Sequence, residues 1–181
     1  MIRPVDLGVC GGYEWEGDPD RTAIVLPGAM LGGAPSCYYA ALALNEMGWR
    51  VVQVWDTFPG GDRVAWPTSR AEAALAYAGE ARLLAGKSAG TLAAGIAADR
   101  GLAAVWLTPL LDQPACVEGL RRTTAPALLV GGTDDPTWNG ELARELADDV
   151  LELDGADHGL ARLEDLPPLM DAVRAFAARA A

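Results

Sequence analysis

Short apolar runs alternate with longer mixed segments along most of the chain. Runs of four to six residues that are apolar almost throughout are typical of strands buried on both faces of a parallel sheet. Such runs predict strands at residues 22–26, 50–55, 81–85, 102–107, 126–130 and 150–153.

The segments between and after these runs favour helices. The predicted helices are residues 35–47, 69–78, 88–99, 139–148 and 166–180. In the last of them, Leu169, Val173 and Phe176 recur on one helical face, as expected for a helix that packs on a sheet. Ser69 with Glu72 three residues later matches a capping box, which predicts that the second helix begins at Ser69.

The regular alternation of strand and helix predicts an α/β fold, with a mostly parallel central sheet flanked by helices on both faces. Residues 5–16 are interrupted by glycines and predict a hairpin at the edge of that sheet. The chain has 181 residues, with no internal repeat and no linker-like stretch. We therefore expect one domain over residues 1–181.

The chain carries a formal net charge of −11, which argues against nucleic acid as a partner because a phosphate backbone requires a basic surface. The same charge disfavours an anionic membrane surface. No apolar stretch reaches the roughly 18 residues that a membrane helix needs. The N-terminal segment has Asp6 and a glycine pair where a signal peptide would carry its apolar core. We therefore expect a cytoplasmic protein that binds neither nucleic acid nor membrane.

Residues that could hold a metal or a cofactor are sparse. Cys10, Cys37 and Cys116 form no close-spaced pair and are expected to be free thiols. His158 is the only histidine, which leaves no ligand set typical of zinc. The glycines match neither of the common nucleotide-binding motifs. We expect no metal and no cofactor.

The sequence Gly86-Lys87-Ser88-Ala89-Gly90 follows an apolar run and opens an alanine-rich helical segment. It matches G-x-S-x-G, the pattern of a nucleophile elbow, which is a sharp turn between strand and helix that exposes a serine hydroxyl. Small flanking residues are needed there because the backbone is strained and the strand and helix approach each other closely.

Two further candidates follow this serine along the chain. His158 lies downstream of Ser88, and the acidic pair Asp134–Asp135 lies between them. Serine, acid and then histidine is the chain order of α/β-hydrolases. Ser88, Asp135 and His158 each follow a predicted strand, and the carboxyl ends of parallel strands meet at one edge of a sheet. We therefore expect these three side chains at the same edge.

On these motifs the chain resembles a small, lidless α/β-hydrolase over nearly its whole length. The resemblance implies that Ser88 is the nucleophile, that His158 is the general base and that an acid orients the imidazole. A G-x-x-D-P pattern found in related hydrolases maps onto residues 132–136 and favours Asp135 as the acid. Asp134 is the alternative, and Asp112 is a more distant one.

The resemblance also implies an oxyanion hole built from two backbone N–H groups. One would belong to Ala89, directly after the nucleophile. The other would come from the loop after the first core strand, with Ala29 as the expected donor and Met30 as the alternative. Lys87 stands where many relatives have histidine. We expect its side chain to be exposed or paired with a carboxylate, and we assign it no catalytic role.

The connection at residues 108–125 is too short for the helical cap that many relatives insert at this point. We therefore expect an open site without a cap. Trp55, Phe58, Leu111 and Trp138 fall in loops at the same edge and, with Met30, are candidates for a substrate pocket. Such side chains are also common in protein cores.

The leading hypothesis is a serine hydrolase that cleaves small carboxylic esters through an acyl-enzyme, with a small-molecule ester as its partner. A thioesterase or an amidase would use the same three residues. The alternative from another class is a hydrolase-like binding protein without activity.

Overall fold

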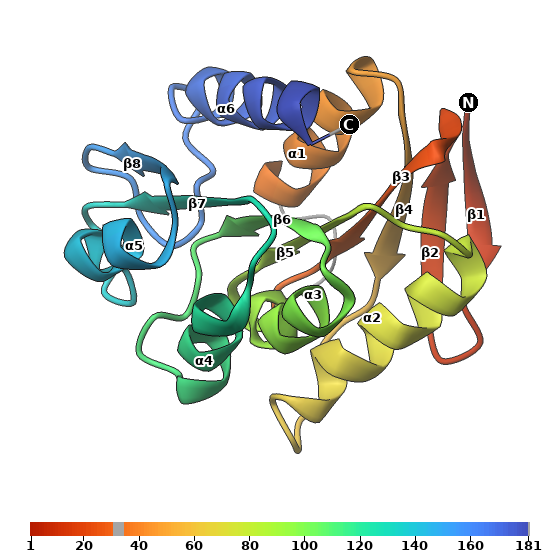
Figure 1. Cartoon of the computed structure of the whole chain (residues 1–181), viewed down its shortest axis with the longest axis horizontal. Helices are drawn as coiled ribbons and strands as arrows, with labels where there is room; N and C mark the ends of the chain where they lie inside the picture. Colours follow the sequence, from red (N-terminus) through yellow and green to blue (C-terminus); the bar gives the residue numbers. More distant parts are fainter. Residues whose placement is uncertain (31–34, 181) are drawn as a thin grey trace.

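A computed structural model describes residues 1–30 and 35–180 of the chain, and a twisted sheet runs through its centre (Figure 1). Its strands are β1 (Ile2–Asp6), β2 (Gly11–Trp15), β3 (Asp18–Leu26), β4 (Trp49–Trp55), β5 (Leu83–Lys87), β6 (Ala103–Leu107), β7 (Ala127–Gly132) and β8 (Asp149–Leu153). In the described residues the strand order is β1-β2-β4-β3-β5-β6-β7-β8. Strands β3 to β8 are parallel, whereas β2 pairs antiparallel with both β1 and β4.

Helices cover both faces of the sheet. They are α1 (Pro35–Glu46), α2 (Ala65–Ala78), the 3₁₀ helix η1 (Ser88–Ala93), α3 (Ala94–Arg100), α4 (Pro114–Arg122), α5 (Gly140–Leu146) and α6 (Leu166–Arg179). Helices α1 and α6 lie side by side above the sheet as drawn in Figure 1, and α2, α3 and α4 lie below it. Helix α5 packs with this second group through Ala143.

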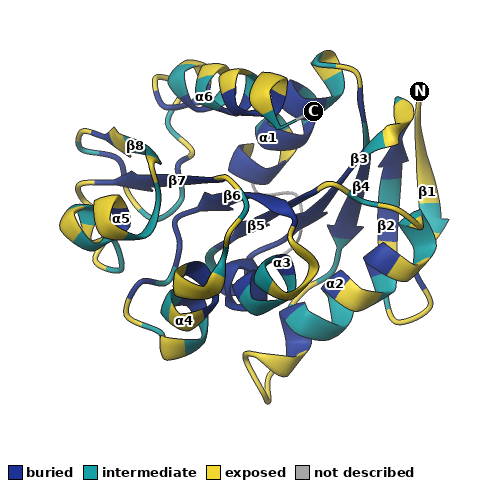
Figure 2. Cartoon of the chain, in the orientation of Figure 1, coloured by how far each residue is buried: buried dark blue, intermediate teal, exposed yellow. Residues whose placement is uncertain are grey.

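The core consists of two layers, one on each side of the sheet. Successive residues of β3 alternate between them: Ala23 and Val25 face α1 and α6, whereas Ile24 and Leu26 face the opposite helices. All four are essentially inaccessible to solvent. Figure 2 shows the same arrangement, with a buried sheet between helices whose outer faces are exposed. Burial on both faces explains why the strands read as continuous apolar runs.

The predicted fold class is confirmed. Each of the six predicted strands corresponds to one of the parallel strands β3 to β8. The N-terminal hairpin is also confirmed, since β1 and β2 pair antiparallel at the edge of the sheet. Helices α1, α5 and α6 agree with the predicted ranges to within two residues at each end.

Two predicted helices differ from the structure. The segment after Ser88 was expected to be one helix, but it opens as the 3₁₀ turn η1 before continuing as α3. Helix α2 begins at Ala65 rather than at Ser69. The Asp62 carboxylate accepts the N–H groups of Val64 and Ala65, both at 2.9 Å, and so starts the helix earlier. Ser69 donates to the Trp66 carbonyl instead of capping.

Helix α4 was not predicted. It is short and begins with Pro114. Its buried residues are Cys116, Gly119 and Leu120. It packs on α3 under the sheet, so the connection between β6 and β7 forms a crossover helix and not a cap. The described part of the chain contains no cap domain, as expected. No helix in residues 1–30 and 35–180 is both long enough and apolar enough to span a bilayer.

Gly119 is where α4 crosses α3. A Cβ atom at this position would lie 2.6 Å from the amide nitrogen of Gly95 and 2.7 Å from the carbonyl carbon of Ala94. Gly119→Ala is therefore expected to lower the free energy of unfolding by about 1–3 kcal/mol through overpacking, although alanine is the better helix former by about 1 kcal/mol. Urea denaturation measures this change. The matched control is Gly11→Ala, where a Cβ meets no atom within 4 Å. An equal loss in both variants would contradict the close crossing.

Candidate active site

The turn after β5 holds Ser88 in a left-handed backbone conformation, with φ 49°. Two glycines make this turn possible. A Cβ at Gly86 would lie 2.8 Å from the Trp106 ring and 3.0 Å from the backbone of Gly90. A Cβ at Gly90 would lie 2.6 Å from the Pro27 carbonyl oxygen. The small residues of the G-x-S-x-G motif are thus required by close backbone contacts, and a positive φ at a non-glycine residue is a strained conformation.

The structure brings Ser88, His158 and Asp135 together at the carboxyl edge of the sheet. The Nε2 atom of His158 lies 2.7 Å from the Ser88 Oγ, and its Nδ1 atom lies 2.7 Å from the Asp135 Oδ2. The three residues follow β5, β8 and β7 respectively. They form a continuous hydrogen-bonded chain from carboxylate to hydroxyl.

The surroundings of Asp135 leave one of its oxygens for the imidazole. Its side chain is fully buried. The Oδ1 atom accepts both the backbone N–H and the hydroxyl of Thr137, each at 2.8 Å, while Oδ2 faces His158. The Thr137 hydroxyl also lies 3.2 Å from the His158 Nδ1. Sequence reasoning missed Thr137, although a hydroxyl residue two positions after a candidate acid is a signal that could have found it.

The two alternative acids lie elsewhere. Asp134 is exposed, and its backbone N–H donates to the Ala156 carbonyl. Asp112 is exposed in a different hollow, beside Gln113. Of the three acids considered, Asp135 is the one that contacts His158.

This geometry determines which imidazole nitrogen carries the proton. An ionised carboxylate only accepts hydrogen bonds, so Nδ1 must donate to Asp135. The Nε2 lone pair then points to the Ser88 hydroxyl and can accept its proton. Such an arrangement activates a serine for attack on an electrophilic carbon.

The candidate oxyanion donors flank the serine. Ala89 is at the start of η1, where the first N–H groups have no acceptor within the helix. Gly28, directly before Ala29, lies so close that a Cβ there would be 3.5 Å from the Ser88 Cβ. The Ala29 carbonyl accepts the Phe58 N–H at 2.9 Å, which ties this loop to the one after β4. The use of the Ala29 and Ala89 amides as an oxyanion hole stays a prediction.

A cavity of about 670 Å³ opens above Ser88 and His158, and this volume is typical of small-molecule sites. Its walls include the apolar side chains of Met30, Pro35 and Trp55. Met30 and Trp55 thus line the same cavity as Ser88 and His158, and their contact with a substrate stays a prediction. Met30 is 82% exposed, so the rim is open to solvent on its side.

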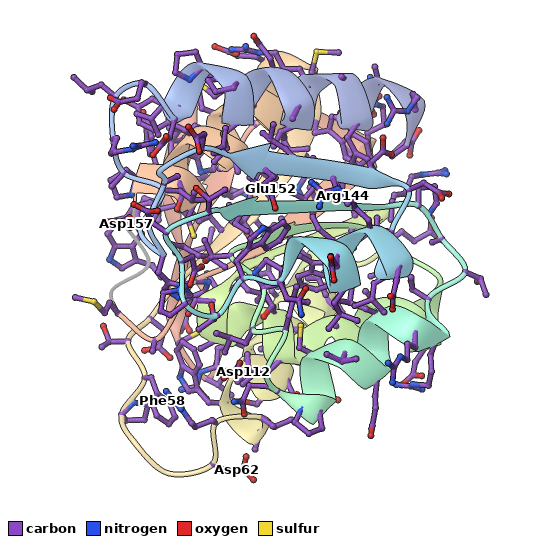
Figure 3. The ribbon with its side chains drawn as sticks, turned by 90° about the vertical axis from the view of Figure 1, so that its left-hand side faces the viewer. Phe58, Asp62, Asp112, Arg144, Glu152 and Asp157 are labelled. Atoms are coloured by element: carbon purple, nitrogen blue, oxygen red, sulfur yellow. The ribbon has the colours of Figure 1, made fainter. Side chains whose placement is uncertain are left out.

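Leu111 and Trp138 do not line this cavity, contrary to expectation. Leu111 is buried in the core on the α2–α5 side of the sheet. The Trp138 ring packs directly on Gly131 and donates its indole N–H to Glu152 at 2.7 Å. Figure 3 shows Glu152 beside Arg144, with which it also forms an ion pair. A loop position in the sequence does not reveal which way the side chain points.

Phe58, also a pocket candidate, packs edge-on against Trp66 with ring centroids 5.5 Å apart. It lies at the same side of the molecule as Asp157, the neighbour of His158 (Figure 3). Phe58 contributes to the site through its backbone, by holding the Ala29 loop, and not through a side chain in the cavity wall.

The expectation for Lys87 is wrong. Its side chain is only 5% exposed, and no carboxylate of residues 1–30 or 35–180 forms an ion pair with it. Its ammonium group donates instead to the His158 carbonyl oxygen at 2.6 Å and to the Thr108 hydroxyl at 3.0 Å. The pKa of Lys87 is lowered from its ordinary value, chiefly because burial disfavours the charged form.

Comparison with known proteins gives matches in structure and none in sequence. No family model matches the chain, and no curated protein sequence matches it. An α/β serine hydrolase homologue from Coxiella burnetii has a TM-score of 0.75 at 16% identity, over 97% of this chain and 96% of that one. Est1E from Butyrivibrio proteoclasticus with ferulic acid bound has a TM-score of 0.75 at 16% identity, over 98% of each chain.

A third similar structure bears on the missing cap. It is an α/β serine hydrolase without a lid from Xanthomonas campestris, with a TM-score of 0.73 at 18% identity, over 99% of this chain and 94% of that one. These matches span nearly the full length of both chains in each case. The chain therefore has the fold of the lidless α/β-hydrolases.

Proposed function

We propose that this protein is a serine hydrolase that cleaves small carboxylic esters through an acyl-enzyme. The observation that carries the proposal is the hydrogen-bonded chain from Asp135 through His158 to Ser88, with 2.7 Å at each step of the imidazole. The fold adds support, since two of the structural neighbours are described as serine hydrolases and the third binds ferulic acid.

The first half of the reaction forms the acyl-enzyme. The Ser88 oxygen attacks the ester carbonyl carbon while its proton passes to the His158 Nε2. Asp135 stabilises the imidazolium that results. The Ala29 and Ala89 N–H groups donate to the negatively charged carbonyl oxygen of the tetrahedral intermediate. When that intermediate collapses, the ester bond breaks and His158 gives its proton to the departing alcohol.

The second half releases the acid. A water molecule attacks the acyl carbon while His158 accepts one of its protons. The new tetrahedral intermediate then expels the Ser88 oxygen, which regains a proton from His158. The free carboxylic acid leaves, and the starting state is restored. These steps use only side chains and backbone amides of the chain, together with water.

The cavity suggests which part of the ester binds where. Met30, Pro35 and Trp55 offer an apolar wall next to Ser88, and such a wall suits the hydrocarbon part of a small substrate. Nothing in the three reacting residues selects the leaving group, so an ester panel should be tested beside matched thioesters and amides.

The nucleophile is tested with Ser88→Ala. This variant is expected to lose turnover of p-nitrophenyl esters by a factor on the order of 10⁶ and to lose labelling by a fluorophosphonate, which reacts only with an activated serine. Ser69→Ala is the matched control, because Ser69 lies in α2 and its hydroxyl bonds with Trp66 and Arg70 of the same helix. Labelling that persists in Ser88→Ala would contradict the proposal, and an unlabelled wild-type protein would favour a binding function without catalysis.

The acid is tested with two neighbouring substitutions. Asp135→Asn is expected to slow ester hydrolysis by roughly 10⁴-fold, since an amide cannot hold the imidazole in the same tautomer or stabilise its charge. Asp134→Asn makes the same chemical change one residue earlier, at an exposed side chain, and is expected to change the rate by less than about twofold. Steady-state kinetics with one aryl ester measure both. The reverse ranking would assign the role to Asp134.

The open cavity leads to an expectation about chain length. Each buried CH₂ contributes about 0.8 kcal/mol only where a wall covers it, and the described chain has no cap to extend the wall. The rate is therefore expected to be highest for acyl chains of about two to six carbons, with no jump when the substrate exceeds its solubility limit. A series of p-nitrophenyl esters measures this. A steady rise to long chains, or sharp activation on emulsified triglyceride, would contradict it.

A further inference from the structure

Lys87 is the only lysine of the chain, and every other cationic side chain apart from His158 is an arginine. It is the last residue of β5 and directly precedes Ser88. A buried amine at this position has a desolvation cost, and replacing a buried charge by an apolar side chain of similar volume is often neutral or stabilising. Stability of the fold is therefore a poor explanation for this lysine.

The two acceptors of the ammonium group lie on different elements. One is the backbone carbonyl of His158, at 2.6 Å, in the loop between β8 and α6. The other is the hydroxyl of Thr108, at 3.0 Å, directly after β6. Thr108 is itself fixed, since it is fully buried and its N–H donates to the Val130 carbonyl of β7 at 2.7 Å. Lys87 thus ties the His158 loop to two central strands.

The groups around the amine act in opposite directions. Burial lowers the pKa of Lys87, whereas Cys37 of α1, Asp135 after β7 and Asp157 beside His158 act to raise it. The acceptors, a carbonyl and a hydroxyl, are neutral, so the ammonium group serves as a hydrogen-bond donor at this point and not as half of an ion pair.

Other contacts hold the residues after His158: the Gly159 carbonyl accepts the Ser36 hydroxyl at 3.3 Å, and Leu160 is buried. The Lys87 ammonium group bonds the backbone of His158 itself. His158 lies between Asp157, which is exposed, and Gly159, and the next residue, Leu160, has a positive φ of 47°. Asp135 restrains only the imidazole ring of His158, through Nδ1. A contact to the backbone of His158 fixes the position from which its imidazole ring extends. This position matters because a misplacement of about 1 Å at a reacting group can cost 10²-fold in rate.

We propose that Lys87 is a positioning residue, which holds the backbone of His158 at the distance from Ser88 that proton transfer requires. The proposal rests on the proposed function. Ser88 and His158 are then linked in two ways. One is the hydrogen bond between their side chains, and the other is the hydrogen bond from Lys87, next to Ser88, to the backbone of His158.

The direct test is Lys87→Met, which keeps the approximate volume and removes both hydrogen bonds. With a p-nitrophenyl ester, kcat is expected to fall by about 10- to 100-fold while KM stays within about twofold, because the loss affects proton transfer and not substrate binding. The rate of fluorophosphonate labelling should fall in parallel. The midpoint of thermal unfolding is not expected to fall, which separates misplacement of His158 from loss of the fold.

A second variant approaches the same contact from the other side. Thr108→Val keeps the lysine but removes one of its acceptors, so kcat should fall by a smaller factor. In the double variant, Lys87→Met with Thr108→Val, kcat should be no lower than in Lys87→Met alone, because residues of one network are not additive. Thr68→Val is the matched control, since the Thr68 hydroxyl donates to the carbonyl of Val64, directly before α2.

The outcomes separate the two proposals. If the wild-type protein neither reacts with the fluorophosphonate nor turns over esters, the proposed function is wrong. If the wild type is active and folded Lys87→Met has the same kcat, the positioning role is wrong and the function stands. If Lys87→Met does not fold, Thr108→Val decides, and a kcat equal to that of Thr68→Val overturns the proposal.

Discussion

The whole site depends on how closely three backbone segments meet at the elbow. Gly86 and Gly90 contact each other, and Gly90 also lies against Pro27 at the end of β3. Within this close approach Ser88 has a positive φ and lies at the carboxyl end of β5. The Ala29 loop continues from β3, so the same contact also brings that loop next to the serine. Any Cβ at the two glycines would separate these parts.

The sheet then determines what the serine meets. Because β5, β6, β7 and β8 are parallel neighbours in that order, the turns after them open at one edge, and Asp135, His158 and Thr108 all come from those turns. These residues are 20 to 70 positions from Ser88 in the sequence. Nevertheless, Asp135 and His158 form the hydrogen-bonded chain to Ser88, and the Thr108 hydroxyl accepts a hydrogen bond from Lys87, directly before Ser88. The parallel arrangement of the strands thus brings residues that are distant in the sequence together in the candidate site.

Much of this could be predicted from the sequence, because the relevant signals are local. Apolar runs identified the parallel strands, and the spacing of Gly86, Ser88 and Gly90 identified the turn. Features that depend on contacts between distant segments were missed or wrong. Lys87 was expected to be exposed or ion-paired because lysine usually is, and no local pattern shows that Thr108 and the His158 backbone surround it. Trp138 was placed at the correct edge, but its direction is determined by Gly131 and Glu152.

Half-buried Ser88 stands between two positions that tolerate no side chain. Its own side chain faces an open cavity. A side chain at this position therefore has room, whereas one at Gly86 or Gly90 has none. The frame therefore separates two kinds of evolutionary change. A side chain at Gly86 or Gly90 would meet backbone atoms, whereas under the proposed function a substitution at Ser88 would exchange the reacting atom without touching those contacts.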